Sequence, residues 1–397
     1  MMNPLIRPQV AAVDRRSFLR VAGLSILGAG ALAACGSDAT PAASSTSTAP
    51  ATTGTASATT SAAMTSTAAE TTVGSTASGS ATTVAPGAYG DIKVQLSWIK
   101  NIEFAGEFFA TEKGYYTDAG FSSVELLTGP VASAEELVAL GSATVGLSAP
   151  DATARYILDQ GAPLKVIGST FQKNPFCILS LEEGKPIKTP ADLKGKNIGI
   201  QSGTNQEIFA GFLKANKIDE SEITFTIVQF DPAPLLENKV DGFMAYATNE
   251  PFIAEAAGKT PVVLLFSDHG LPLTAETFTV TQDSIDNNRA MLKAFLYAEI
   301  LGWKDAVADP AGSAKLVVDT YGKDLKLDEK GQTEEATAQN ELIVSDDTRA
   351  NGLFTLTDAK VAEIISAIAL TGHEITAEDL FDLSLLAEVY AEYPELI

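Results

Sequence analysis

Two groups of aromatic and polar side chains follow extended runs of the chain, and their residue types suit recognition of a flat ring. Trp98 and Asn101 come after the first alternating apolar run, and Tyr246, Asn249 and Glu250 come after a later one. Aromatic faces stack on planar ligands, and a carboxylate accepts hydrogen bonds from ring amino or N–H groups. A stacked base contributes about 1–3 kcal/mol, so a micromolar site needs several polar contacts besides. These residues therefore predict binding of a small heterocycle.

Each of these side chains also has an ordinary structural explanation. A lone tryptophan such as Trp98 is commonly a core residue, and a glutamate such as Glu250 is commonly solvated or caps a helix. Both residues stand at the carboxyl end of a predicted strand, which is where open α/β sheets hold their ligands. This position is consistent with ligand binding for both, and the family resemblance given below favours that interpretation over the structural one.

Further candidates come from the same strand-end positions. Thr204 is spaced with Glu207 as a capping box, so helix capping is an equal alternative for it. Asp151, in its simpler interpretation, is a charge in the first turn of a helix. Free backbone N–H groups at a helix start suit a ligand carbonyl or a weakly anionic group. The six further candidates are Ser148, Asp151, Phe171, Asn174, Gly203 and Thr204.

The inventory of nucleophiles and metal ligands is small. Beyond the N-terminal region the chain has one cysteine, Cys177, and two histidines, His269 and His373. These residues cannot form a metal cluster of normal ligand spacing, and no Gly-x-Ser-x-Gly elbow is present. We therefore expect no catalytic residue, no metal ligand and no cofactor.

Strand-like and helix-like segments alternate from about residue 90 until about residue 283, and the remainder reads as helix. This alternation predicts an α/β fold with mostly parallel sheets, and its length predicts two lobes. The extended runs "FCILSL" and "FTVTQ" are the expected crossings between them. We accordingly expect lobe I to comprise residues 90–179 and 281–397, and lobe II to comprise residues 180–280.

The charge of the chain limits its partners. The formal net charge is −23, and only Arg155, Arg289 and Arg349 lie beyond the N-terminal region. An acidic surface argues against nucleic acid and against charge-driven binding to anionic lipid. Scarce arginine also disfavours a strongly anionic ligand, although helix N-termini alone could bind one.

The N-terminal region has the pattern of an export signal. Arg15 and Arg16 precede a short, weakly apolar run, which looks like a twin-arginine signal, and "LAAC" resembles a bacterial lipobox ending at Cys35. Residues 36–88 are almost entirely Ala, Ser, Thr, Gly and Pro, a composition that cannot form a core. We expect a signal peptide at 1–34, lipidation at Cys35 and a tether over 35–89.

The folded part resembles the solute-binding lipoproteins of ABC importers, and within them the branch that binds thiamine pyrimidine precursors and riboflavin. The stretch "LSWIKNIEFAGEFFATEKGYYTDAGF" carries Leu-x-Trp-x-x-Asn, then Ala-Gly and Lys-Gly-Tyr-Tyr, as members of that branch do; "TPADLKGKNIGI" and "YATNEPF" are similar too. The resemblance implies a two-lobed type II periplasmic-binding fold and a ligand-binding acid at Glu250. It also implies a monomer that is lipid-anchored to the outer face of the cell membrane and delivers a small molecule to ABC permease subunits.

The resemblance leaves the ligand open. Alkanesulfonate, taurine and nitrate binders share much of the framework, so each is an alternative to a heterocycle. A eukaryotic relative of the fold is a pyrimidine-synthesising enzyme with a cysteine-rich run near its site. This chain has one cysteine in its folded region, so we expect a binding protein and not an enzyme.

Overall fold

The computed structural model describes residues 84–397. The expected signal peptide, Cys35 and nearly all of the expected tether lie outside the described residues. Among the helices of the described part, none is both long and apolar enough to cross a membrane.

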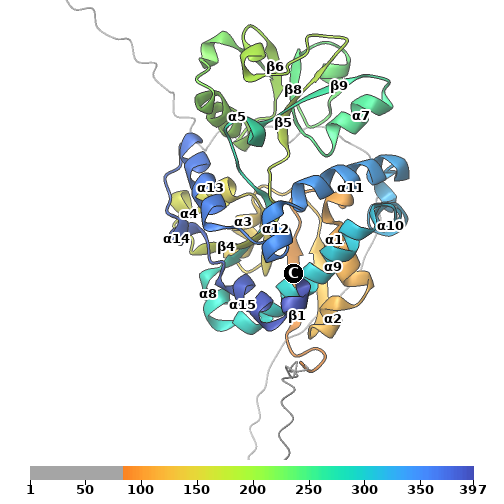
Figure 1. Cartoon of the computed structure of the whole chain (residues 1–397), viewed down its shortest axis with the longest axis vertical. Coiled ribbons are helices and arrows are strands. Elements are labelled where there is room, and N and C mark those ends of the chain that lie inside the picture. The colour runs from red at the N-terminus through yellow and green to blue at the C-terminus, as the bar shows by residue number, and fades with distance from the viewer. Residues whose placement is uncertain (1–83) are drawn as a thin grey trace, which may run out of the picture. The chain divides into compact units, whose positions relative to one another are not determined.

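Two five-stranded sheets organise the described part, one in each lobe (Figure 1). The first sheet has the order β2-β1-β3-β10-β4, and the second has the order β7-β6-β8-β5-β9. Strands β4, β5, β8 and β10 are buried along nearly their whole length, because helices cover both faces of each sheet. The strands are β1 Gly90–Gln95, β2 Phe121–Leu127, β3 Val145–Ser148, β4 Leu164–Phe171, β5 Phe176–Leu181, β6 Asn197–Ile200, β7 Thr224–Ile227, β8 Gly242–Tyr246, β9 Pro261–Leu265 and β10 Ala275–Thr281.

The sheets are mixed rather than mostly parallel. In the first sheet β1 pairs in parallel with β2 and β3, whereas β10 runs antiparallel to β3 and β4. In the second sheet β6 pairs in parallel with β7 and β8, whereas β5 runs antiparallel to β8 and β9. The two antiparallel strands, β5 and β10, are the ones that the chain enters from the other lobe. They therefore run against the direction set by the local strand-helix-strand units.

Helices fill the connections and the whole C-terminal part. Their starts follow ordinary capping chemistry: Ser133 Oγ accepts the N–H of Glu136, and Thr357 Oγ1 accepts that of Lys360. The α-helices are α1 Ala105–Glu112, α2 Tyr115–Asp118, α3 Ala134–Ala139, α4 Pro150–Gln160, α5 Thr204–Ala215, α6 Ala233–Leu236, α7 Glu250–Ala256, α8 Gln282–Asn287, α9 Arg289–Ala308, α10 Pro310–Leu316, α11 Glu329–Ile343, α12 Asp346–Asn351, α13 Asp358–Leu370, α14 Ala377–Leu380 and α15 Ser384–Glu392. The shorter turns are the 3-10 helices η1 Ile102–Phe104, η2 Pro190–Leu193, η3 Glu220–Glu222, η4 Phe266–His269, η6 Lys323–Leu325 and η7 Pro394–Leu396, and the π-helix η5 Val317–Tyr321.

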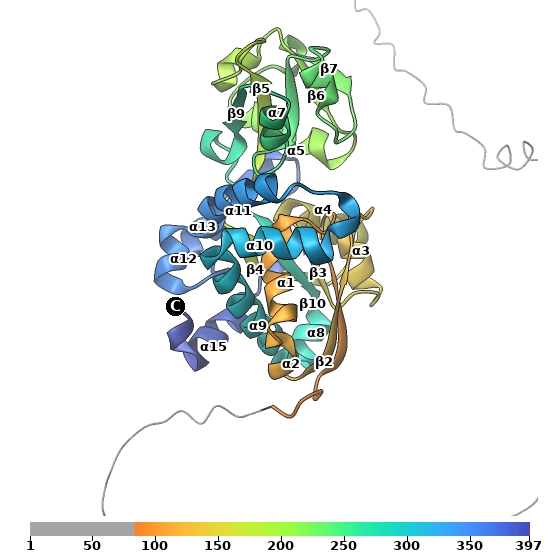
Figure 2. The same ribbon diagram turned by 90° about the vertical axis from the view of Figure 1, so that its right-hand side faces the viewer.

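Helix α1 packs directly on α9 in the core of the first lobe (Figures 1 and 2). The close approach requires glycine on both helices. A Cβ on Gly106 would lie 2.2 Å from the ring of Trp303, and a Cβ on Gly302 would lie 2.2 Å from the carbonyl oxygen of Gly106. Because α1 follows the strand-end residues Trp98 and Asn101, this packing fixes the position of the segment that carries them.

The chain crosses between the lobes at residues 172–175 and 270–274. Asn174 joins the two crossings: its backbone N–H donates to the carbonyl of Leu273 at 2.8 Å, and its Nδ2 donates to that of Thr274 at 3.1 Å. Sequence analysis placed the crossings in "FCILSL" and "FTVTQ", but these runs are β5 and most of β10, each paired within a single sheet. The crossings are the short segments that precede them.

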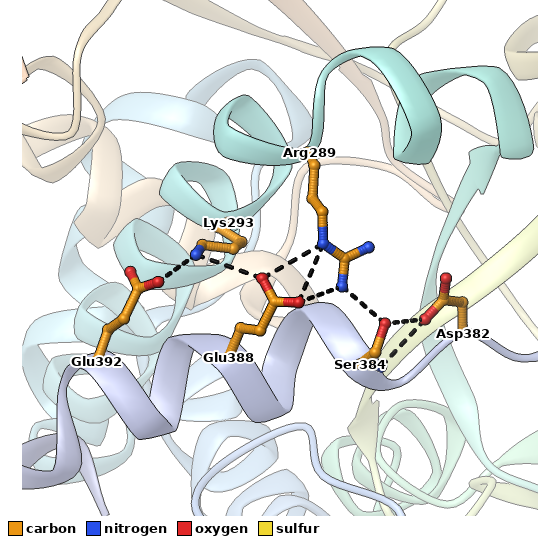
Figure 3. A network of polar contacts seen from close by, with 6 residues as sticks. All are labelled: Arg289, Lys293, Asp382, Ser384, Glu388 and Glu392. Atoms are coloured by element: carbon orange, nitrogen blue, oxygen red, sulfur yellow. Dashed lines mark hydrogen bonds and ion pairs between the residues drawn. The ribbon is translucent and has the colours of Figure 1, made fainter.

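The C-terminal helix is held against α9 by a network of charged side chains (Figure 3). Arg289 Nη2 donates to Glu388 at 2.6 Å and to Ser384 Oγ at 2.7 Å, and Lys293 lies 3.4 Å from Glu388 and also pairs with Glu392. The carboxylates are about half exposed, so each pair contributes at most about 1 kcal/mol. The network orients α15 on the outside of the first lobe, away from the pocket described next.

Candidate functional site

A cavity of about 170 Å³ lies where both lobes and α11 meet. The first lobe contributes the segment that follows β1, and the second contributes the ends of β6 and β8, the loop after β7 and the start of α7. Helix α11, which lies beneath the second lobe in both views, contributes two side chains (Figures 1 and 2). The principal lining residues are Ser97, Trp98, Asn101 and Glu103 from the first lobe, Phe176, Phe230, Tyr246, Asn249 and Glu250 from the second, and Glu335 and Gln339 from α11.

Aromatic rings form two walls of the cavity. The indole of Trp98 meets the ring of Phe230 edge to face, with centroids 4.9 Å apart and an interplanar angle of 65°. Phe176 and Tyr246 meet in the same manner, with centroids 4.7 Å apart and an angle of 85°. Trp98 and Phe230 come from different lobes, so their contact bridges the cavity. A planar ligand in this space finds aromatic surface from both lobes.

Glu250 is a buried carboxylate at the first position of α7. Its Oε2 accepts the backbone N–H of Tyr246 at 2.8 Å, which turns the side chain back toward the end of β8. Pro251, next in the helix, has no N–H to satisfy. Burial raises the pKa of Glu250 to about 7. The remaining oxygen, Oε1, is suited to accept a hydrogen bond from a ligand donor.

A second group of acids lies on the first-lobe side. Asn101 caps η1 by accepting the N–H of Glu103 at 3.3 Å, and the cap sets the direction in which Glu103 leaves the backbone. Ser97 Oγ donates to Oε1 of Glu276, a residue of β10, at 2.8 Å. Burial raises the pKa of Glu103 to about 7, and burial followed by the nearby Glu103 raises the pKa of Glu276 well above its usual value.

The cavity lining carries acidic side chains and, in the described part, no basic ones. Glu103, Glu250 and Glu335 line it, and no Lys, Arg or His is among the lining residues of the described part. Burial raises the pKa of Glu335 to about 8, in the same direction as the pKa values of the other two acids. A ligand that brings N–H donors or positive charge would favour the ionised form of these carboxyl groups, whereas an anion would find no basic side chain to pair with among them.

Five of the residues proposed from sequence line this cavity together: Trp98, Asn101, Tyr246, Asn249 and Glu250. They come from two segments that are distant in the chain, one at the end of β1 and one between β8 and α7. Their convergence follows from the facing carboxyl ends of strands in the two sheets.

The other six lie outside the cavity, for separate reasons. Ser148 donates to Glu135, and Asp151 is buried in the first turn of α4, where burial raises its pKa to about 6. Gly203, with φ +94°, precedes α5, and Thr204 Oγ1 accepts from Arg155 Nη2 at 3.1 Å. These four residues belong to hydrogen bonds, helix starts and an inter-lobe contact outside the cavity.

The remaining two belong to the core and to the crossing. Phe171 is fully buried in the core of the first lobe at the end of β4. Asn174 bonds the two crossing segments to each other, as described above. Strand-end position alone did not separate such structural roles from a place in the cavity.

Most of the other lining residues were not among the sequence candidates, and they include Glu103, Phe230, Glu335 and Gln339. Phe230 stands in the loop beyond β7, which ends at Ile227. The signal for α11 was available: Glu335 and Gln339, with Gln332, form one polar helix face at spacings of three and four residues. A polar face is normally solvated, and its burial here is a tertiary effect.

The family model described as NMT1/THI5 like matches residues 101–313, which is more than half of the chain. Among curated proteins, the riboflavin-binding protein RibY of Chloroflexus aurantiacus is 27% identical over 244 residues, which cover 59% of this chain and 69% of RibY. The residues matched by the family model, 101–313, include all the second-lobe residues that line the cavity.

Solved structures share the fold at low sequence identity. The periplasmic aliphatic sulphonate binding protein SsuA of Escherichia coli has a TM-score of 0.54 at 16% identity, covering 70% of this chain and 86% of that one. The periplasmic nitrate-binding protein NrtA of Synechocystis PCC 6803 has a TM-score of 0.56 at 14% identity, covering 77% and 90%. The two-lobed α/β architecture is therefore that of periplasmic binding proteins.

Proposed function

The chain belongs to the NMT1/THI5-like family, and on that premise we propose that it is an extracytoplasmic solute-binding protein that delivers a small planar heterocycle to an ABC importer. Its ligand is of the thiamine pyrimidine precursor or riboflavin type. RibY, a relative of the chain, is named for riboflavin binding. The partners are the permease subunits of the importer, and the protein acts as a monomer without catalysis.

The composition of the cavity carries this proposal. Aromatic rings from both lobes flank a space that is lined by three carboxylates and, within the described residues, by no basic side chain. Stacking supplies affinity for a flat ring, and buried carboxylates supply acceptors for its amino or N–H groups. In our proposal Trp98 and Tyr246 stack, Glu250 accepts, and Asn101 and Asn249 complete the polar contacts.

The same composition disfavours the sulfonate, taurine and nitrate alternatives, although the fold is shared with binders of such ions. A sulfonate or nitrate in this cavity would face Glu103, Glu250 and Glu335 without an arginine fork. Recognition of such anions normally relies on arginine or on helix N–H groups. Here α5 contributes Asn205 to the lining, but Thr204, which bonds to Arg155, is not a lining residue, and no arginine lines the cavity in the described part.

A thermal-shift panel tests the proposal. The purified protein is mixed in turn with 4-amino-5-hydroxymethyl-2-methylpyrimidine, riboflavin, taurine, an alkanesulfonate and nitrate. Because ligand that binds only the folded state stabilises it, we expect a concentration-dependent rise in Tm with a heterocycle. A rise with taurine, the alkanesulfonate or nitrate and none with either heterocycle would reject the proposal.

Export and anchoring form a separate part of the proposal, supported by the twin-arginine run and "LAAC". We expect the mature protein to be held at the outer face of the membrane by lipid on Cys35. Cys35→Ser should release a folded, ligand-binding protein from the membrane fraction. If the variant stayed in the membrane pellet after a carbonate wash, lipidation at Cys35 would be ruled out.

A further inference from the structure

Helix α11 turns a polar face inward. Gln332, Glu335 and Gln339 lie on one side of the helix, and each is between 2% and 5% exposed. Burying three polar side chains is unfavourable unless their hydrogen-bonding groups find partners. The hydrogen-bond partners of these three side chains indicate the role of this helix face.

Two glutamines of this face hold the backbone of Ile102 in η1. Gln332 Oε1 accepts the N–H of Ile102 at 2.9 Å, and Gln339 Nε2 donates to its carbonyl at 3.0 Å. Gln332 Nε2 donates in turn to Glu335 Oε2 at 2.9 Å. The contacts attach α11 to the segment that carries Asn101 and Glu103. They also leave specific atoms of Glu335 and Gln339 facing the cavity.

The contact with Ile102 fixes the orientation of the Gln339 amide. A backbone carbonyl only accepts hydrogen bonds, so the Nε2 end must face Ile102 and the Oε1 end must face away. Gln339 lines the cavity, and its Oε1 is buried without a hydrogen-bond partner among the described residues. An amide oxygen can only accept, so this atom requires a donor from elsewhere.

Glu335 stands one helical turn before Gln339 and also lines the cavity. Its Oε2 is engaged by Gln332, which holds the carboxyl group in place and keeps Oε1 on the other side. The two side chains therefore present neighbouring acceptor oxygens from α11. Glu250 presents its carboxylate from the second lobe.

We propose that Glu335 and Gln339 form a second binding subsite. There, α11 accepts a hydrogen bond from one N–H or O–H group of the ligand, while Glu250 accepts a hydrogen bond from another. This inference rests on the proposed function and narrows it. The ligand must carry two separate donor groups on a planar ring, as an aminopyrimidine with a hydroxymethyl group does. A ring that turns only carbonyl oxygens toward α11 would leave Gln339 Oε1 unpaired and would bind more weakly.

The proposal is tested with ligand analogues that each lack one hydrogen-bond donor. Their affinities are measured by isothermal titration calorimetry on the full-length chain carrying Cys35→Ser. The probes are 4-amino-5-hydroxymethyl-2-methylpyrimidine and two analogues, one without the amino group and one without the hydroxyl group. Gln339→Met should lower affinity for the full probe about tenfold, the size of one hydrogen bond to a buried acceptor. For the analogue that lacks the donor bound by Gln339, the same substitution should change affinity by less than about twofold.

Two matched controls separate recognition from folding. Asn340→Leu removes an amide from the same helix, where Asn340 Nδ2 donates to the carbonyl of Val307 at 3.0 Å, and Asn340 is not a cavity residue. It should therefore show no dependence on which donor the probe carries. Glu335→Gln should act as Gln339→Met does, whereas Glu334→Gln, at a neighbouring residue that pairs with Lys330 on the surface, should have no effect.

The outcomes are distinguishable. If Gln339→Met and Glu335→Gln bind all three probes as the wild type does, or lose affinity equally for all three, α11 does not read a donor and only this inference fails. If the wild type binds neither the pyrimidine nor riboflavin, the proposed function fails and this inference fails with it.

Discussion

The indole of Trp98 and the ring of Phe230 meet edge to face across the cavity, with centroids 4.9 Å apart. Trp98 follows a strand of the first sheet, and Phe230 follows a strand of the second. The two rings therefore join the lobes at the cavity. We expect lobe closure and stacking of a ligand to depend on the same pair of side chains.

Replacement of Trp98 by alanine should weaken ligand binding by about 1–3 kcal/mol, because a stacking surface is lost. Trp98→Phe should restore part of that loss. The side chain is only partly buried, so the free energy of unfolding should change little. Isothermal titration with the bound heterocycle and thermal denaturation check both expectations. A Trp98→Ala protein that unfolds, or one that binds at full affinity, would identify the residue as structural.

Glu250→Gln keeps the shape of the side chain and removes its charge. Binding should weaken by about 1.5–3 kcal/mol if the carboxylate accepts a charge-assisted hydrogen bond from the ligand. Stability should hold, because a glutamine oxygen can still accept the N–H of Tyr246. Glu255→Gln, an exposed change on the same helix α7, is the control and should bind normally. Equal affinities for the two variants would remove Glu250 from the site.

Stability should fall as pH rises from about 5 to about 8. Burial raises the pKa of Glu107 from 4.5 to about 8, so in this window the folded state holds a proton that the unfolded state has released. Folding then binds protons, and each unit of rising pH disfavours the folded state until the folded-state pKa is passed. Glu103 and Glu335 shift in the same direction and add to the effect.

Thermal denaturation at constant ionic strength measures this dependence. Wild-type Tm should be several degrees lower at pH 8 than at pH 5. Neither carboxylate oxygen of Glu107 has a hydrogen-bond partner in the described part, so Glu107→Gln removes the titration with little other change. The variant should equal the wild type near pH 5 and exceed it at pH 8. A wild-type Tm that rises with pH would contradict the assignment.

Ligand binding should close the lobes about the crossings at residues 172–175 and 270–274, which are tied by Asn174. Two short crossings beside a cavity favour a hinge motion over local refolding. Small-angle scattering of the same chain with and without saturating ligand should give a smaller radius of gyration in the complex. An unchanged radius would show that the lobes are already closed or do not move.

The cavity residues that were predicted from sequence share a local signal. Trp98 and Glu250 follow strands whose alternation or apolar character is visible in the chain, and strand ends face the ligand in this class of fold. Glu335 and Gln339 lie about ninety residues beyond the last cavity strand, on a helix whose polar face looks in the sequence like an ordinary solvated face. Only the packing of α11 on η1, through Ile102, brings them to the cavity.

The fold class was likewise predictable from sequence, whereas the boundaries of the two lobes depend on which strands pair with each other. "FCILSL" was recognised as extended, but whether it crosses or joins a sheet is decided by its hydrogen bonds to β8 and β9. Those bonds form with segments more than sixty residues away. Strand direction followed the same rule: β5 and β10 are antiparallel because of the route of the chain, which local periodicity does not encode.

Isothermal titration of the wild type with 4-amino-5-hydroxymethyl-2-methylpyrimidine, riboflavin, taurine and nitrate tests the central claim most directly. A cavity of aromatic rings and carboxylates without a basic lining residue in the described part should bind one of the two heterocycles with a micromolar or smaller Kd, equivalent to about 8 kcal/mol or more. Taurine and nitrate should give no measurable heat of binding. Tight binding of either anion, with neither heterocycle bound, would contradict the account.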